Sequence, residues 1–157
     1  MKKILIIRFS SFGDIVQSLF AANALKLKQN IEVHFLTKVD FFSLVSMSPY
    51  VDKVHIFEKE KGFLSLLKIY KDLSFEKFDY VYDAHKNIRS FFSRFYFKNS
   101  LLIVRSKERW KRFLLFKFRK NNYKNWPYKG GHSYIYPLQH EGLADKSNIS
   151  FQTWKFK

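Results

Sequence analysis

The first 28 residues combine a continuous apolar run with a helical pattern of apolar positions. Residues 2–8 read Lys-Lys-Ile-Leu-Ile-Ile-Arg, a pattern typical of a strand that is buried on both faces of a parallel sheet. After a short polar turn, apolar residues recur at helical spacing at Ile15, Val16, Leu19, Ala22 and Leu25. The turn holds one glycine and one carboxylate, and it lies where ligands bind in open α/β sheets, outside the carboxyl ends of the strands.

The same alternation of strand and helix patterns continues along the chain. Further strands are predicted at 31–37, 51–57, 78–83 and 101–104, and helices at 40–46, 62–73, 88–97 and 107–119. This order predicts an α/β fold, a Rossmann-like parallel sheet with flanking helices and right-handed crossovers. Beyond it, the sequence predicts a loop at 121–131, a helix at 132–143 closed by Gly142, and a strand or interdomain segment at 149–156.

Composition narrows the class of protein. A chain of 157 residues with 46% hydrophobic residues is expected to form one globular domain with a substantial core. No apolar run approaches the ~18 residues that a membrane span needs. Arg8 and Asp14 interrupt the first apolar run, so we expect no signal peptide. The absence of cysteine excludes disulfides and thiolate metal sites and fits a cytoplasmic protein.

Positive charge dominates the sequence: 29 Lys and Arg stand against 13 Asp and Glu, a net charge of +16. Such an excess favours an anionic partner: nucleic acid, an acidic membrane surface or a phosphorylated glycolipid. Residues 105–124 contain nine basic side chains interleaved with aromatics. This stretch fits an amphipathic helix with a solvated basic face, an interfacial helix on an anionic membrane, or a nucleic-acid-binding segment.

The turn after the first strand holds the first candidate site. As residue types, Ser10, Ser11 and Gly13 fit a simple turn, and Asp14 fits a carboxylate in the first turn of a helix. Alternatively, the hydroxyls and helix amides face substrate oxygens or phosphate, and Asp14 is a general base directed into a cleft. No Walker or GxGxxG pattern occurs, so the sequence predicts no independent nucleotide site.

The turn after the fourth strand holds the second candidate site. Asp83 fits a buried carboxylate that caps the turn, with His85 and Arg89 as solvated neighbours. Alternatively, Arg89 binds carboxylates or phosphates of a substrate through paired hydrogen bonds. We predict no metal site, because the histidines show no recognisable ligand spacing; they are His34, His55, His85, His132 and His140.

Two segments together resemble one family, the bacterial ADP-heptose:lipopolysaccharide heptosyltransferases of glycosyltransferase family nine. They are the strand, turn and helix at 4–16, with Ser-Ser-Phe-Gly-Asp in the turn, and the segment 78–90, where a strand ends in Asp-Ala-His. The resemblance covers most of the chain and implies that Asp14 is the general base. At the second turn the family often has Gln-Gly where this chain has His85 and Lys86.

The resemblance also implies an architecture. Family members have two Rossmann-like domains in a GT-B arrangement, and the second domain binds the nucleotide sugar. Residues 1–143 would then be the acceptor-side domain and 144–157 an interdomain segment, with the second domain missing from this chain.

The implied reaction is transfer of heptose from ADP-heptose to the lipopolysaccharide inner core, without metal or other cofactor. The acceptor is an anionic glycolipid, which suggests a cytoplasmic protein with peripheral contact at the inner face of the cytoplasmic membrane. A non-catalytic basic module that binds nucleic acid or membrane is the alternative. By the resemblance, the acceptor-binding residues are Ser10, Ser11, Gly13, His85, Arg89, Arg109 and His132. Tyr136 departs from the family, which usually has Arg there.

Overall fold

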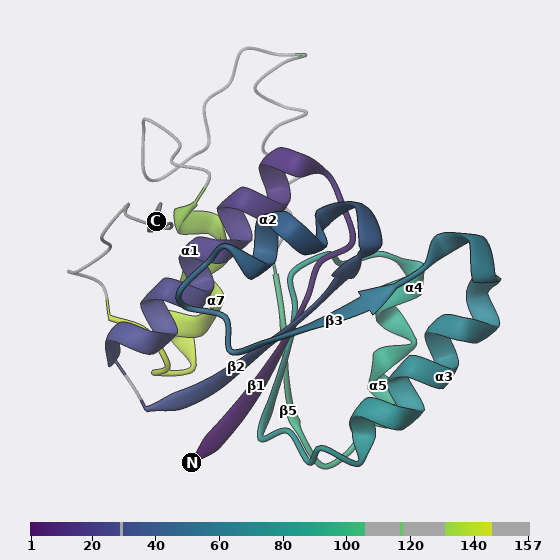
Figure 1. Ribbon diagram of the computed structural model, residues 1–157. Helices are drawn as coiled ribbons and strands as arrows, with labels where there is room; N and C mark the ends of the chain where they lie inside the picture. Colours follow the sequence, from purple (N-terminus) through teal and green to yellow (C-terminus); the bar gives the residue numbers. More distant parts are fainter. Residues whose placement is uncertain (29, 106–116, 118–130, 146–157) are drawn as a thin grey trace.

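A five-stranded parallel sheet forms the centre of the molecule (Figure 1). The computed structural model describes residues 1–28, 30–105, 117 and 131–145. The strand order is β3-β2-β1-β4-β5, so the first strand lies in the middle of the sheet. The strands are β1 (Lys2–Ile7), β2 (Ile31–Lys38), β3 (Lys53–Phe57), β4 (Tyr80–Asp83) and β5 (Leu101–Val104). The predicted α/β fold with a parallel sheet is therefore confirmed.

Helices cover both faces of this sheet (Figure 1). One face carries α1 (Phe12–Lys28), α2 (Phe42–Ser46) and α7 (His132–His140). The other face carries α3 (Gly62–Ser74), α4 (Ile88–Phe91) and α5 (Ser93–Tyr96). Two short 3-10 turns, η1 (Val39–Phe41) and η2 (Lys59–Lys61), precede α2 and α3.

The apolar run of β1 supplies both hydrophobic cores. Ile4 and Ile6 are fully buried on the α1 side of the sheet, whereas Leu5 and Ile7 are fully buried on the α3 side. Successive side chains of a strand point to opposite faces, so a strand covered on both faces needs a continuous apolar sequence. Burial of four aliphatic side chains, each worth about 1.5–3 kcal/mol, makes β1 the anchor of the sheet.

Some element boundaries differ from the expectation. The predicted helix at 88–97 is two short helices, α4 and α5, which end at Phe91 and Tyr96. The last helix ends at His140 rather than at residue 143, although Gly142 closes it as predicted. Gly142 has a φ of 70°, and the amides of Gly142 and Leu143 bond to carbonyls of the last turn.

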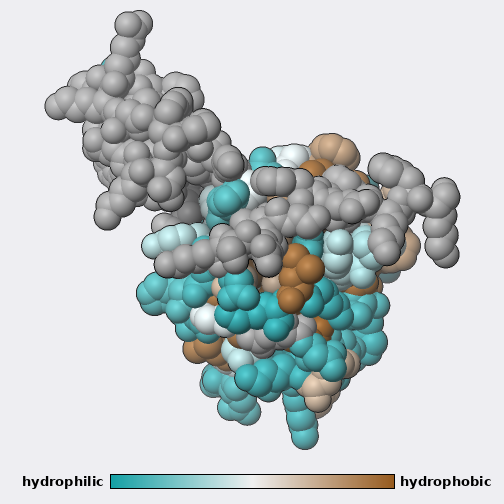
Figure 2. Space-filling model, turned by 90° about the vertical axis from the view of Figure 1, so that its left-hand side faces the viewer, coloured by the Kyte–Doolittle hydropathy of each residue, from teal (hydrophilic) through white to brown (hydrophobic). Residues whose placement is uncertain are grey.

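Several expectations concern residues that the structure does not describe. The basic helix at 107–119 falls outside the described residues except for Lys117, and the loop at 121–131 except for Gly131. The segment at 149–156 also lies outside them. Within the described part of the chain, no helix combines the length and apolar character needed to cross a membrane. Figure 2 shows a mostly hydrophilic face with hydrophobic residues in small groups.

Two histidines join β2 and β3 on the α3 side of the sheet. His34 is fully buried, and its Nε2 lies 2.8 Å from Oε1 of Glu32. A carboxylate can only accept, so Nε2 of His34 carries a proton, and Nδ1 of His34 lies 3.0 Å from Nε2 of His55. Burial, followed by the charges of His34 and Lys53, lowers the pKa of His55 from 6.5 to about 4, with Glu76 opposing.

We expect this histidine pair to make stability depend on pH. The pKa of His55 is lower in the folded state, so between pH 6.5 and about 4 the unfolded chain binds more protons. The free energy of unfolding should therefore be highest above pH 6.5 and fall as the pH drops towards 4. Urea unfolding across this range should show the decline, and His55→Gln should flatten it.

The matched control is His140→Gln, because the side chain of His140 is 77% exposed on α7. It should leave the decline unchanged. The carboxylates of Glu32 and Glu76 have pKa values lowered from 4.5, so their contribution is lost at lower pH. Equal flattening by both histidine variants would contradict the assignment to His55.

Candidate functional site

Three strands bring their carboxyl ends together at one edge of the sheet. Ile7 of β1 is aligned with Asp83 of β4, which is aligned with Val104 of β5. The residues that follow β1 and β5 are both arginines, and the register places them at the same level on either side of β4. Arg8 is 4% exposed and Arg105 is 6% exposed. Two buried guanidinium groups at one edge require a compensating anion.

Asp14 lies at this edge, in the first turn of α1. The carbonyl of Ser11 accepts the amide of Ile15 at 2.8 Å, which begins the helix, and the Ser11 hydroxyl donates to Oδ2 of Asp14 at 3.2 Å. The local interpretation of Asp14 as a first-turn carboxylate is therefore correct. It does not account for the contacts that Asp14 makes with distant parts of the chain.

Three side chains from elsewhere in the fold converge on Asp14. The Tyr134 hydroxyl donates to Oδ1 at 2.7 Å, and the Arg8 guanidinium forms an ion pair with Oδ2. Nη1 of Arg105 lies 3.9 Å from Oδ1. The Asp14 side chain keeps 36% of its surface exposed. We call Arg8, Asp14, Arg105 and Tyr134 the Asp14 cluster.

Tyr134 holds the Asp14 cluster together. Its side chain is fully buried, with the guanidinium carbon of Arg105 at 3.6 Å and that of Arg8 at 5.8 Å from the ring centroid. The Tyr134 carbonyl accepts from the Tyr82 hydroxyl at 2.7 Å, and Arg105 also donates to the Ser133 hydroxyl at 2.8 Å. These cation–π contacts and hydrogen bonds join α7 to the sheet and to α1.

The electrostatic environment keeps Asp14 ionised. Partial burial alone would raise the pKa of Asp14, but the hydrogen bond from Tyr134 and the charge of Arg8 outweigh it, so the pKa is lowered. Burial raises the pKa of the Tyr134 hydroxyl, and its hydrogen bond to Asp14 raises this pKa further. The hydroxyl therefore stays protonated and donates to Asp14. The cluster can thus present an anionic oxygen with a fixed orientation to a ligand.

Asp83 has the turn-capping role predicted for it. Its Oδ1 accepts the amides of His85 at 3.0 Å and Lys86 at 2.7 Å, and its Oδ2 accepts the Ser90 hydroxyl at 2.9 Å. The expectation that His85 is solvated is wrong, because its buried ring packs edge-on against Phe9 at 5.5 Å. In the same turn, Arg8 donates to the carbonyl of Ala84 at 2.7 Å, which connects this turn to the Asp14 cluster.

The other predicted site residues differ in exposure and in position relative to Asp14. Ser10 is partly exposed, and Gly13 is exposed with no atom within 4 Å of a Cβ built on it. His132 is exposed in the first turn of α7. Arg89 lies on α4 with its carbonyl bonded to the Tyr70 hydroxyl, and no described contact joins its side chain to Asp14. Arg109 lies outside the described residues.

Sequence reasoning missed three members of the Asp14 cluster as site residues: Arg8, Arg105 and Tyr134. The available signal was a charged residue placed directly after an apolar strand at both 4–7 and 101–104. Within the described residues, no group of three or more His, Asp or Glu side chains could hold a metal ion.

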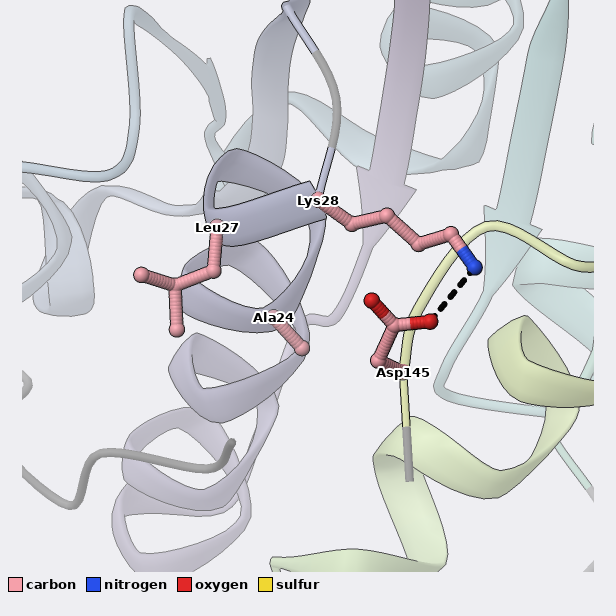
Figure 3. Close-up of a pocket in the computed structure, with 4 residues that line it drawn as sticks. All are labelled: Ala24, Leu27, Lys28 and Asp145. Atoms are coloured by element: carbon pink, nitrogen blue, oxygen red, sulfur yellow. Dashed lines mark hydrogen bonds and ion pairs between the residues drawn. The ribbon is translucent and has the colours of Figure 1, made fainter. Parts of the chain in front are cut away.

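A pocket at the other end of α1 is separate from this site. Its lining is Ala24, Leu27, Lys28 and Asp145, and Figure 3 shows Lys28 reaching across to Asp145. The two charges form an ion pair at 2.6 Å. This pocket lies at the carboxyl end of α1, whereas Asp14 lies in the first turn.

Tyr134→Phe should raise the pKa of Asp14 towards its ordinary value of 3.8, because it removes only the hydroxyl that donates to Oδ1. The free energy of unfolding should fall by about 1 kcal/mol, the usual net value of one hydrogen bond. Carboxyl-carbon NMR titration and urea unfolding measure the two effects.

The control is Tyr136→Phe, which removes a hydroxyl from the same helix at a residue that is 66% exposed. It should change neither quantity. An Asp14 pKa that is the same in the Tyr134→Phe and wild-type chains would show that Tyr134 does not tune the carboxylate.

Comparison with known proteins gives one relative in sequence. No known family profile matches the chain. Over 90 residues it is 30% identical to lipopolysaccharide heptosyltransferase 1 of Campylobacter coli, a match that covers 56% of this chain and 26% of that protein.

Solved structures give the same fold. A glycosyltransferase family 9 protein from Veillonella parvula matches with a TM-score of 0.73 and 15% identity, over 99% of this chain and 45% of that one. Heptosyltransferase WaaC of E. coli, solved with ADP-2-deoxy-2-fluoro heptose, matches with a TM-score of 0.65 and 13% identity. This match covers 95% of this chain and 51% of WaaC. E. coli heptosyltransferase II matches with a TM-score of 0.61 and 19% identity, over 100% of this chain and 44% of that one.

The chain spans about half the length of these solved chains and about a quarter of the curated relative. The predicted resemblance is confirmed by both comparisons: this chain has the α/β fold of the family 9 heptosyltransferases and resembles part of such an enzyme in sequence.

Proposed function

We propose that this chain is the acceptor-side half of a heptosyltransferase, in which Asp14 is the general base. The observation that carries the proposal is the Asp14 carboxylate, which is ionised, partly exposed and held at the carboxyl edge of the sheet by Arg8 and Tyr134. A base must be unprotonated, fixed in position and accessible to its substrate, and Asp14 meets all three requirements.

The proposed reaction is a direct displacement at a sugar carbon. A hydroxyl of the acceptor attacks the anomeric carbon of ADP-heptose, its proton passes to Asp14, and ADP leaves with the electrons of the broken C–O bond. The relative from Campylobacter coli is named for lipopolysaccharide, and WaaC was solved with an ADP-heptose analogue, which supports this choice of acceptor and donor.

The geometry of Asp14 leaves room for that proton. Oδ2 already receives the Ser11 hydroxyl and pairs with Arg8, whereas Oδ1 receives one hydrogen bond, from Tyr134, and Nη1 of Arg105 lies 3.9 Å away, beyond hydrogen-bond distance. A carboxylate oxygen can accept two bonds, so Oδ1 is the oxygen that would take the proton. A lowered pKa makes Asp14 a weak base, which suffices because the hydroxyl proton becomes acidic as the new C–O bond forms.

The acceptor would lie over the turn at 10–14. Gly13 has open space around its α-carbon, so an anionic sugar could approach the backbone amides at the start of α1. We propose that Ser10, Ser11 and Gly13 bind this acceptor, together with His85, Arg89, Arg109 and His132. At position 136 this chain has Tyr where the family usually has Arg, so the acceptor would contact one fewer cation.

The donor would be bound by a second domain in a GT-B arrangement. That domain could belong to the rest of the same protein or to another chain, since this chain spans about half the length of the solved relatives. The acceptor is an anionic glycolipid, so the site would work at the inner face of the cytoplasmic membrane, and nucleic acid would not be its ligand.

The chain alone should bind the acceptor but not the donor. Titration with heptose-free core glycolipid in detergent should shift the backbone amide signals of Gly13 and Asp14 in NMR spectra, because the acceptor lies over this turn. ADP-heptose should leave them unchanged. Shifts caused by ADP-heptose and not by the glycolipid would reverse the proposed roles of the two halves.

Asp14→Asn should abolish transfer in a chimera of this chain with the part of WaaC that it does not cover. The amide keeps the shape of the carboxylate but cannot take the proton, so the rate should fall at least ~100-fold. Mass spectrometry of the acceptor measures the product.

Asp40→Asn is the matched control, because Asp40 is an exposed carboxylate in η1, at the same edge of the sheet. Its chimera should keep wild-type activity. Wild-type rates in the Asp14→Asn chimera, with the fold verified by circular dichroism, would reduce Asp14 to a helix-terminal carboxylate.

A further inference from the structure

Large hydrophobic side chains gather on the surface of α3, α4 and α5, the helices that share one face of the sheet (Figure 1). We call five of them the aromatic patch. Their exposed fractions are 38% for Phe63, 79% for Leu64, 75% for Ile88, 43% for Phe91 and 58% for Phe95. Single exposed apolar residues are ordinary on a protein surface, but a group on neighbouring helices indicates an interaction surface.

Ring contacts link the three phenylalanines of the aromatic patch. Phe92 lies beneath it, with ring centroids 5.0 Å from Phe63, 6.2 Å from Phe91 and 5.9 Å from Phe95. The guanidinium carbon of Arg94 lies 4.7 Å from the centroid of the Phe91 ring. Phe92 thus connects α3 to both α4 and α5. The Arg94 guanidinium places a positive charge next to the apolar surface.

The charge around the aromatic patch has one sign on the α4–α5 side. No Asp or Glu occurs between residues 84 and 107, whereas Lys86, Arg94 and Lys98 are exposed there. The α3 side also carries acidic side chains: Glu58 is paired with Lys61 at 2.9 Å, and Glu60 and Asp72 are exposed. Aromatic and aliphatic side chains bordered by Lys and Arg form the pattern of a surface that lies on anionic lipid.

We propose that the aromatic patch docks on the surface of an anionic phospholipid bilayer. Phe and Leu side chains would enter the headgroup boundary, while Lys86, Arg94 and Lys98 would face lipid phosphates. The aliphatic side chains of Leu64 and Ile88 favour lipid over nucleic acid, because stacking with bases requires rings. This inference does not rest on the proposed transfer reaction, since phospholipids contain no sugar acceptor.

The position of the patch relates it to the Asp14 cluster. α4 directly follows the turn after β4, where Asp83 bonds to Ser90 and Arg8 bonds to Ala84. Docking through this face would therefore bring the carboxyl edge of the sheet close to the bilayer. The patch is separate from the basic stretch at 105–124, so the two surfaces can be tested separately.

The experiment is flotation of the whole chain with vesicles at physiological salt. Wild type should bind vesicles of phosphatidylglycerol and phosphatidylethanolamine and should bind phosphatidylcholine vesicles far less. Ile88→Asn combined with Phe95→Asn should lower the partition coefficient on anionic vesicles at least about tenfold, because two apolar side chains no longer enter the bilayer.

The matched control is Leu27→Asn combined with Phe75→Asn, two residues that are 54% and 73% exposed outside the patch. It removes similar side chains from the carboxyl end of α1 and from just after α3, and it should change the partition less than twofold. Thermal melting should show that both double variants are folded. Equal losses in both would overturn the assignment to this face.

A second pair of variants tests the charge. Arg94→Gln should weaken binding about fivefold, whereas Lys71→Gln, on the exposed side of α3, should have little effect.

Three other outcomes would overturn the proposal. One is equal binding of wild type to neutral and anionic vesicles. Another is loss of DNA-duplex binding, but not vesicle binding, in the Ile88→Asn, Phe95→Asn chain. The third is a wild-type dimer in sedimentation that this variant abolishes, which would make the patch an interface between copies.

Discussion

The ion pair between Arg8 and Asp14 is the interaction on which the site depends. Arg8 and Arg105 are more than nine-tenths buried at the carboxyl ends of β1 and β5, and an uncompensated buried charge costs several kcal/mol. Asp14 supplies the negative charge, and the Tyr134 ring lies against both guanidinium groups. The strands, α1 and α7 are therefore joined at one carboxylate, at the edge where parallel sheets bind ligands.

The same contact serves stability and chemistry at once. The hydrogen bond from Tyr134 and the charge of Arg8 keep the pKa of Asp14 low, so the carboxylate stays ionised, and they also fix its orientation. A proton acceptor on a first helical turn would otherwise be free to rotate in solvent. Because α7 provides Tyr134, the orientation and pKa of the Asp14 carboxylate depend on a residue 120 positions away in the sequence.

The side chains at the amino and carboxyl ends of the strands make different kinds of contact. At the amino ends of the strands, Lys3 pairs with Glu76 at 3.3 Å and its amide bonds to Asp79 at 2.7 Å. Midway along β2, the pair of His34 and His55 joins this strand to β3. These contacts connect neighbouring elements. At the carboxyl ends, Asp14 keeps 36% exposure and the glycine beside it has open space. The candidate base thus lies at the opposite edge of the sheet from the ion pair of Lys3 and Glu76.

The sequence by itself determined the parallel α/β fold, the strands at 31–37 and 101–104, the position of Asp14 in a first helical turn and the turn-capping role of Asp83. These features follow from local patterns: apolar periodicity, turn residues and carboxylates at element ends. Only the tertiary structure decided which distant residues meet. Burial of Arg8 and Arg105, the contact from Tyr134 and the burial of His85 depend on β4 lying beside β1 and on α7 packing against α1. A local pattern indicates which side of an element faces the core, but strand order selects the neighbour that it meets there.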